Sequence, residues 1–158
     1  MSDDAPREAQ ATEDPLLSAP PTPAPLVGTW VVRGEVLGED GEGVVADVAG
    51  RGTYRWLGPT VVHELDVEVG GRRRLALEVV EPFDAARGAF PTRAHDDEGG
   101  VRAGTAAVDP HGVWTFRDGD GATTVRPSED GSAMTSERVR RTASGDVPAV
   151  RLTWRRLS

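Results

Sequence analysis

The chain contains no cysteine and no long apolar run. Without cysteine it has no disulfide framework, no thiolate nucleophile and no cysteine zinc site, which fits a reducing compartment. A membrane-spanning helix needs about 20 consecutive apolar residues. The N-terminus, Met1-Ser2-Asp3-Asp4, also lacks the basic and apolar regions of a signal peptide. We therefore expect a cytoplasmic protein with no membrane partner.

Lysine is absent as well, so arginine provides every basic side chain, and the formal net charge is -8. Such an acidic protein is soluble and repels polyanions at long range, so we expect no nucleic-acid partner. Arginines cluster at residues 72–74 and 138–141. We interpret these clusters as strand residues that face solvent.

Residues 1–25 are rich in proline and acidic side chains and contain a single leucine pair. Such a segment cannot bury enough apolar surface to offset the conformational entropy that it would lose on folding. We predict a disordered tail over residues 1–25. The remaining residues, 26–158, have the length of a single folded domain.

From Leu26 onward, short stretches of alternating apolar and polar residues are separated by glycine, aspartate and proline. This pattern is typical of consecutive β-hairpins. About ten short strands are expected, and we predict an all-β fold in which they form one antiparallel up-and-down barrel. A barrel is favoured because sequential hairpins close on themselves and leave no exposed edge. All four tryptophans, Trp30, Trp56, Trp114 and Trp154, are expected in its core.

The clearest alternation lies in residues 61–69, where His63 shares a face with valines and a leucine while the acidic residues point the other way. His63 is therefore predicted to face the barrel interior. Gly70 and Gly71 then form a two-residue turn, since glycine adopts the positive φ that such turns require. In the next strand, 72–81, one face has Leu75, Leu77 and Val79, and the other has Arg74, Ala76 and Glu78.

Several segments resemble a known group of barrels. Leu26-Val27-Gly28-Thr29-Trp30 resembles the Gly-x-Trp opening of lipocalin-like (calycin) barrels. A longer resemblance, over residues 26–157, is to an uncharacterised bacterial domain-of-unknown-function family of lipocalin-like barrels that is common in actinobacteria. It rests on the segments 52–57, 61–64, 78–80, 83–84, 90–99, 114–116 and 128–131.

The resemblance implies a small antiparallel barrel with an interior pocket and no established activity. The chain departs from the family at Glu81-Pro82-Phe83-Asp84, where the usual turn is Gly-Tyr-Asp-Pro. Haem barrels of the nitrobindin type share a Gly-Thr-Trp opening, but they bind iron through a histidine late in the chain. The last histidine here is His111, so we expect neither haem nor another cofactor.

Standard catalytic signatures are missing: there is no Gly-x-Ser-x-Gly, no phosphate-binding Gly-x-x-x-x-Gly-Lys and no His-Glu-x-x-His. Asp118, Asp120 and Glu129 have the spacing of a calcium loop, but Ala122 cannot act as a ligand at the fifth position. The acidic run beside His95 is interpreted as a solvated hairpin end. We therefore predict no metal site.

An imidazole on an aliphatic face needs a hydrogen-bond partner or is destabilising by about 1–3 kcal/mol. The leading hypothesis is a barrel that binds a small, largely apolar molecule, with His63, Tyr54, Arg93 and His95 as ligand-contacting residues. One alternative is an isomerase or cyclase for a hydrophobic metabolite, with His63 as acid or base. Another is a protein-interaction module, and the commoner role of a buried histidine is structural.

Overall fold

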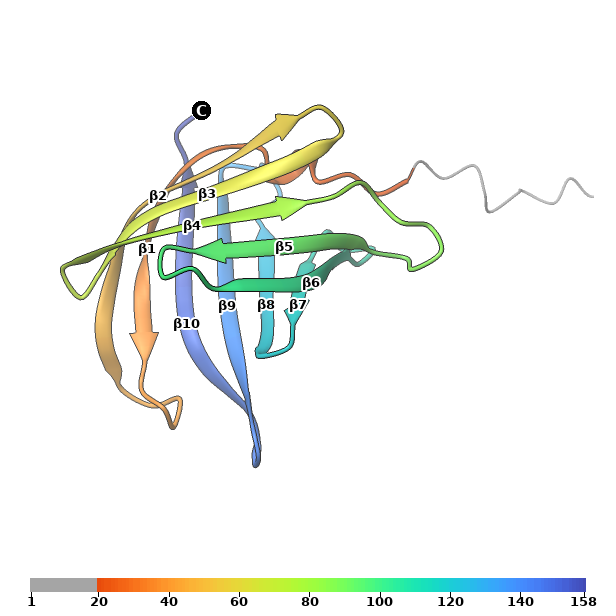
Figure 1. The fold of residues 1–158 in the computed structure, drawn as a ribbon. Coiled ribbons are helices and arrows are strands. Elements are labelled where there is room, and N and C mark those ends of the chain that lie inside the picture. Colours follow the sequence, from red (N-terminus) through yellow and green to blue (C-terminus); the bar gives the residue numbers. More distant parts are fainter. Residues whose placement is uncertain (1–19) are drawn as a thin grey trace, which may run out of the picture.

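The computed structural model describes residues 20–158 and confirms the predicted all-β barrel (Figure 1). The tail prediction for residues 1–19 lies outside the described residues. A short 3-10 helix, η2 (Ala24–Leu26), precedes ten strands. The strands are β1 (Gly28–Leu37), β2 (Val44–Leu57), β3 (Thr60–Val69), β4 (Arg72–Val80), β5 (Phe90–Asp96), β6 (Val101–Val108), β7 (Trp114–Asp118), β8 (Gly121–Pro127), β9 (Ala133–Thr142) and β10 (Gly145–Arg156).

Each strand pairs antiparallel with its neighbours in sequence, and the first and last strands pair with each other. The β1–β10 register extends from Trp30 opposite Arg156 to Val36 opposite Val150. This pairing closes the sheet, so that each of the ten strands pairs with another strand on both sides. Because side chains alternate across a strand, every strand then has one face toward the interior.

The hydrophobic core fills one end of the barrel. Trp30 and Val32 are fully buried, as the alternation in β1 predicts. Phe83, from the loop between β4 and β5, packs on Phe90 with the ring centroids 5.2 Å apart, and Phe90 in turn lies 5.3 Å from Trp114. Aromatic rings at these distances pack favourably as well as burying a large apolar area.

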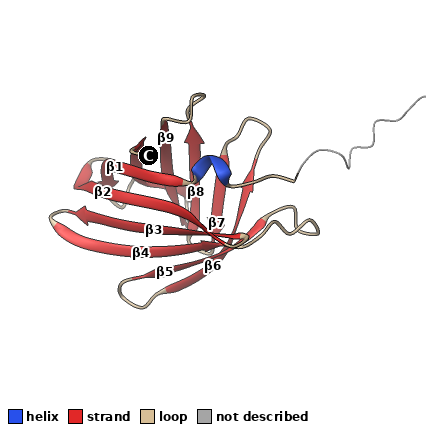
Figure 2. Cartoon of the chain, turned by 90° about the horizontal axis from the view of Figure 1, so that it is seen from above, coloured by secondary structure: helices blue, strands red, loops and turns tan. Residues whose placement is uncertain are grey.

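The short helix η2 lies at this end of the barrel (Figure 2). The Trp30 indole N–H donates to the carbonyl oxygen of Leu26 at 3.0 Å, which attaches η2 to β1. The Arg156 guanidinium lies 4.2 Å from the Trp30 ring and donates to the carbonyl oxygens of Pro25, Val27 and Gly131. Ala24 and Pro25 were assigned to the disordered tail, but they form η2 with Leu26, and the Pro25 carbonyl oxygen accepts a hydrogen bond from Arg156.

The turn between β3 and β4 follows the prediction, with φ of 59° at Gly70 and 81° at Gly71. This tight turn fixes the register, so that His63 lies opposite Glu78. Glu78 therefore shares the interior face with His63. Leu75 lies on the outer face and is 43% exposed.

Trp56 corrects the expectation that all four tryptophans are in the core, because it is 45% exposed. It lies opposite Val61 beside the turn between β2 and β3, where the barrel ends and no neighbouring strand covers the ring.

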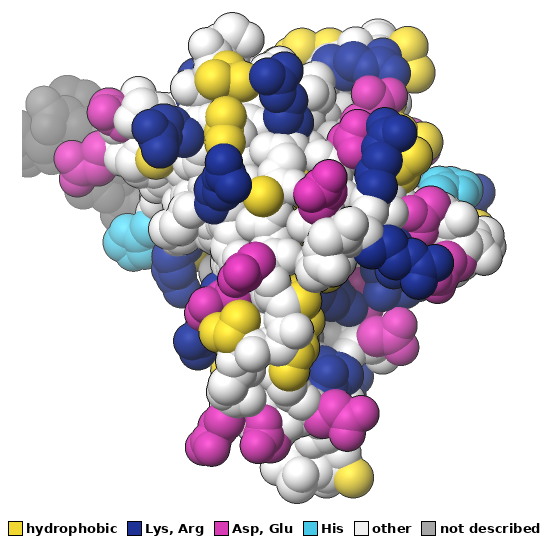
Figure 3. Space-filling view, turned by 90° about the vertical axis from the view of Figure 1, so that its left-hand side faces the viewer, with side chains coloured by type: hydrophobic (Ala, Val, Ile, Leu, Met, Phe, Trp, Pro, Cys, Tyr) yellow, Lys and Arg dark blue, Asp and Glu magenta, His cyan; other side chains and the backbone are white. Residues whose placement is uncertain are grey.

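The outer surface mixes both signs of charge (Figure 3). Arg73 donates two hydrogen bonds to Asp66, and Arg74 pairs with Asp97 at 2.9 Å. Exposed pairs of this kind contribute at most about 1 kcal/mol each, so they favour solubility more than stability. No helix among residues 20–158 is long and apolar enough to cross a membrane.

We predict that Trp30→Ala lowers the free energy of unfolding by about 3–5 kcal/mol. The substitution leaves a large cavity at the end of the barrel where η2 lies, and it removes the hydrogen bond from the indole to Leu26. The matched control is Trp56→Ala, which deletes the same side chain where it is half exposed and is expected to cost far less. Urea unfolding of both variants measures the difference. Equal losses would contradict the assigned core.

Candidate functional site

A cavity of about 240 Å³ lies inside the barrel, between the buried core and the opposite end. One part of its wall is apolar and includes Leu65, Phe116, Val125, Val150, Leu152 and Trp154. The rest is polar and includes Tyr54, His63, Glu78, Arg102, Asp118, Thr123, Ser136 and Arg138. A concave, largely apolar space with a few converging polar groups is the usual form of a ligand site.

Tyr54 and His63 form one side of the site. They lie opposite each other on β2 and β3, and their rings stack with centroids 3.8 Å apart and planes 4° from parallel. Gly52 makes this arrangement possible, because a side chain there would overlap the Trp154 ring. The sequence therefore predicts correctly that His63 faces inward, and its side chain is only 11% exposed.

The His63 imidazole lacks full hydrogen bonding. Its Nε2 atom is buried without a partner among the described residues. Its Nδ1 atom lies 4.0 Å from Glu78 Oε1, which is longer than a hydrogen bond. Burial lowers the pKa of His63 to about 3, so the imidazole is neutral at pH 7.

Glu78 is the most unusual carboxyl group of the site. It forms no hydrogen bond within residues 20–158, and the one basic side chain of this range within 4.0 Å of its carboxyl is that of His63, which is neutral at pH 7. The pKa of Glu78 is raised to about 7, mainly by burial and also by the charge of Asp118, while Arg102 and Arg138 oppose the shift. Burial, with the charge of Glu78, also raises the pKa of the Tyr54 phenol well above its ordinary value. At neutral pH Glu78 can thus either donate or accept a proton.

Asp118 and Arg138 face Glu78 across the cavity. Arg138 donates from both terminal nitrogens to Asp118, at 3.0 and 3.1 Å, and this bidentate pair holds both side chains in place. Asp118 lies on β7 and Arg138 on β9, with β8 between them. The residue of β8 opposite Asp118 is Gly121, which has no side chain to separate the pair. Although burial opposes the effect, hydrogen bonds from Arg138 and from the Asp120 backbone lower the pKa of Asp118.

Arg138 and Arg140 correct the interpretation of the 138–141 cluster as solvent-facing. Arg138 lies opposite Val150 and Thr123, which line the interior cavity, and Arg140 has the same parity on β9. Alternation alone could not reveal this, because the apolar residue between them, Val139, suggests the opposite facing.

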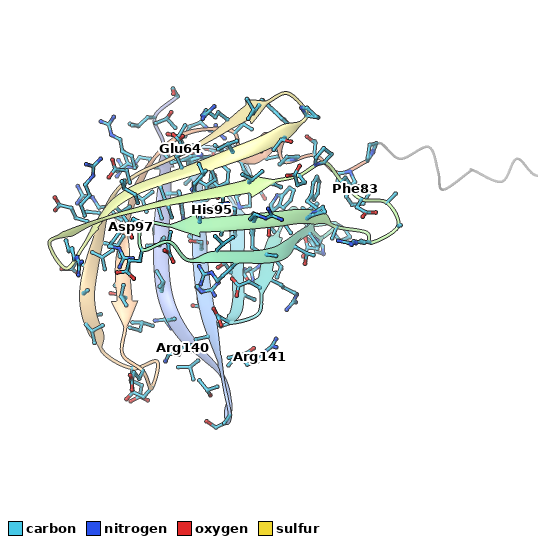
Figure 4. All side chains as sticks on the ribbon, in the orientation of Figure 1. Glu64, Phe83, His95, Asp97, Arg140 and Arg141 are labelled. Carbon is cyan, nitrogen blue, oxygen red and sulfur yellow. The ribbon has the colours of Figure 1, made fainter. Side chains whose placement is uncertain are left out.

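Arg93 and His95 are not part of the interior site. Their partners on β4 are Val79 and Leu77, which lie on the outer face, whereas Ala94 lies opposite Glu78 on the inner one. His95 instead borders a surface depression with Glu64 and Asp97 (Figure 4). The expectation that Arg93 and His95 contact an interior ligand is therefore wrong. The register of β5 with β4 places Ala94 inside the barrel and its two neighbours, Arg93 and His95, outside.

The acidic run beside His95 is engaged in local structure. Asp97 accepts hydrogen bonds from Arg74 and from the backbone of Leu75, and Asp96 accepts from the backbone of Glu98 and Gly100. Within residues 20–158, no group of three or more histidine or acidic side chains is placed to hold a metal ion.

Glu78, Asp118 and Arg138 were missed as site residues at the level of sequence. For Glu78 a signal existed: a two-residue turn at Gly70-Gly71 dictates that residue 78 lies opposite residue 63. For Asp118 and Arg138 there was none, because they approach each other across β8. A scan against models of protein families finds no match for this chain, and a search of curated proteins finds no similar sequence.

The opposite pKa shifts of Glu78 and His63 predict a pH dependence of stability. Between pH 4.5 and about 7, the native state retains a proton on Glu78 that the unfolded chain has lost, so this group lowers stability as pH rises. Between about pH 3 and 6.5, the unfolded chain protonates a histidine that stays neutral in the native state, so His63 raises stability as pH rises. The two contributions offset each other where the ranges overlap.

We expect Glu78→Gln to remove the contribution of Glu78 to the pH dependence of the free energy of unfolding. The variant should gain stability relative to the original protein as pH rises from 4.5 to about 7, by up to about 1.4 kcal/mol per pH unit. Urea unfolding across this range measures the gain. Glu68→Gln, which removes an exposed carboxylate on β3, controls for the loss of one negative charge. A stability difference independent of pH would show that the Glu78 carboxyl is solvated.

Proposed function

We propose that this protein binds a small molecule inside the barrel, with an apolar body against Leu65, Phe116 and Leu152 and a polar group beside Glu78. The observation behind this proposal is the Glu78 carboxyl, which lines the cavity without a hydrogen-bond partner among residues 20–158. The Nε2 atom of the neighbouring His63 is buried without a partner among the same residues, and such a group is destabilising by about 1–3 kcal/mol. A ligand group that forms hydrogen bonds with Glu78 and His63 would offset that cost.

The size of the cavity limits the ligand. Ligand pockets usually measure about 300–1,000 Å³, and this one is smaller, at about 240 Å³. The ligand is therefore small.

The resemblance of residues 26–157 to lipocalin-like barrels supports the same proposal, because it implies an interior pocket. The absence of cysteine supports a cytoplasmic location.

A second candidate function is proton-transfer catalysis in the same cavity, as in the isomerase alternative. Glu78 favours it, because an acid-base group is most effective when its pKa lies near the working pH, and the pKa of Glu78 is about 7. His63, whose pKa is about 3, suits that role less well and would instead orient the substrate through its stacked ring.

Filling the cavity tests the binding proposal. Ala94 lines the cavity, and we predict that Ala94→Phe abolishes binding of octan-1-ol, a neutral probe with an apolar chain and one hydroxyl group. Ala103→Phe is the matched control, because Ala103 lies on the outer face of β6 opposite Arg93. Calorimetric titration of both variants gives the comparison. Undiminished binding by the Ala94 variant, or no binding by the original protein, would contradict the proposal.

Native mass spectrometry of the protein purified from its own organism then separates the two candidate functions. A binding protein releases the retained molecule unchanged. An enzyme converts the retained molecule on incubation, and Glu78→Gln should stop that conversion while leaving the molecule bound.

A further inference from the structure

The end of the barrel opposite Trp30 contains a second cavity, of about 590 Å³. It borders the interior cavity, since Arg102, Arg138 and Val150 line both. We call it the arginine mouth, because Arg102, Arg138, Arg140 and Arg141 line it. Arg140 and Arg141 lie on the part of β9 that leads to the long β9–β10 hairpin (Figure 4).

The positive charge of the arginine mouth exceeds the negative charge that neutralises it. Asp118 pairs with Arg138 at 3.0 Å, and Asp120 lies 3.7 Å from Arg102. Arg140 donates to the backbone carbonyl oxygen of Glu39 at 2.6 Å, which leaves its charge uncompensated. Neither Arg140 nor Arg141 forms an ion pair with any other residue of 20–158, although Asp146 lies opposite Arg141 in the β9–β10 pairing.

This local excess stands out in a chain whose formal net charge is -8. Arg138 and Arg140 share the inner face of β9, and repulsion between like charges on one face is unfavourable unless an anion lies between them. Guanidinium groups are planar donors that match the oxygen atoms of carboxylate and phosphate groups.

We infer that the arginine mouth binds the anionic head of an amphiphilic ligand, while the apolar body of the ligand occupies the interior cavity. This inference rests on the proposed function. It also gives the ligand one orientation, because an anionic head placed deeper would meet the Glu78 and Asp118 carboxyls. The deep end of the ligand is instead uncharged and can donate a hydrogen bond to Glu78.

The test compares probes with one eight-carbon chain and different heads, by calorimetric titration at neutral pH. Octanoate and octyl phosphate are anionic, octan-1-ol is neutral and octylammonium is cationic. We expect at least one anion to bind about tenfold or more tightly than octan-1-ol, and octylammonium to bind most weakly. Added salt should weaken the binding of the anions more than that of the alcohol. A carboxylate ligand is indicated if octanoate binds better, and a phosphate ligand if octyl phosphate does.

Substitutions then locate the head group. The double variant Arg140→Gln/Arg141→Gln should bind the preferred anion about tenfold or more weakly and bind octan-1-ol as before. Arg155→Gln and Arg72→Gln together form the matched control, since they remove two exposed arginines from β10 and β4 without touching the mouth. Circular dichroism confirms that each variant is folded.

Two outcomes would overturn the inference: equal affinity of the original protein for octan-1-ol and both anions, or anion binding that the mouth substitutions do not weaken. The first is read from the original protein alone, so it does not depend on how the variants fold. Binding of octan-1-ol that Ala94→Phe abolishes would leave the proposed function standing in either case. If the original protein binds none of the four probes, both the inference and the proposed function are contradicted.

Discussion

The pairing of β1 with β10 is the interaction on which the rest of the structure depends. It joins residues more than a hundred positions apart, from Trp30 opposite Arg156 to Val36 opposite Val150. Closing so long a loop is entropically costly, and the contacts of Arg156 with the Trp30 ring and with three backbone carbonyls help to offset that cost. Once the sheet is closed, every strand must place half of its side chains inside.

The two ends of the barrel interior therefore differ in the side chains that the strands contribute. At the Trp30 end the inward side chains are aromatic or aliphatic and exclude water. Nearer the other end, β4, β7 and β9 contribute Glu78, Asp118 and Arg138, and only the last two satisfy each other. Desolvation then acts oppositely on the remaining neighbours, since it lowers the pKa of His63 and raises that of Glu78. Both groups are drawn toward their neutral forms.

The same division gives the two adjoining cavities different chemistry. The interior cavity pairs an apolar wall with a carboxyl group that can exchange a proton, whereas the arginine mouth has an excess of cations. A molecule that spans both would meet apolar contacts along its body and opposite electrostatic preferences at its two ends. Under the proposed function, such matching of shape and charge would give the barrel its specificity.

The sequence by itself determined the fold class, the burial of Trp30, the turn at Gly70-Gly71 and the inward face of His63, because these follow from local alternation and from the φ that glycine permits. Local alternation was misleading in β4 and β9, where leucines and Val139 suggested the wrong facing for Glu78 and Arg138. Only the tertiary structure decided those positions, since the facing of a strand is fixed by register with its neighbours. It also decided that Asp118 meets Arg138 and that Arg93 and His95 lie outside, because barrel closure brings together residues from strands that share no local pattern.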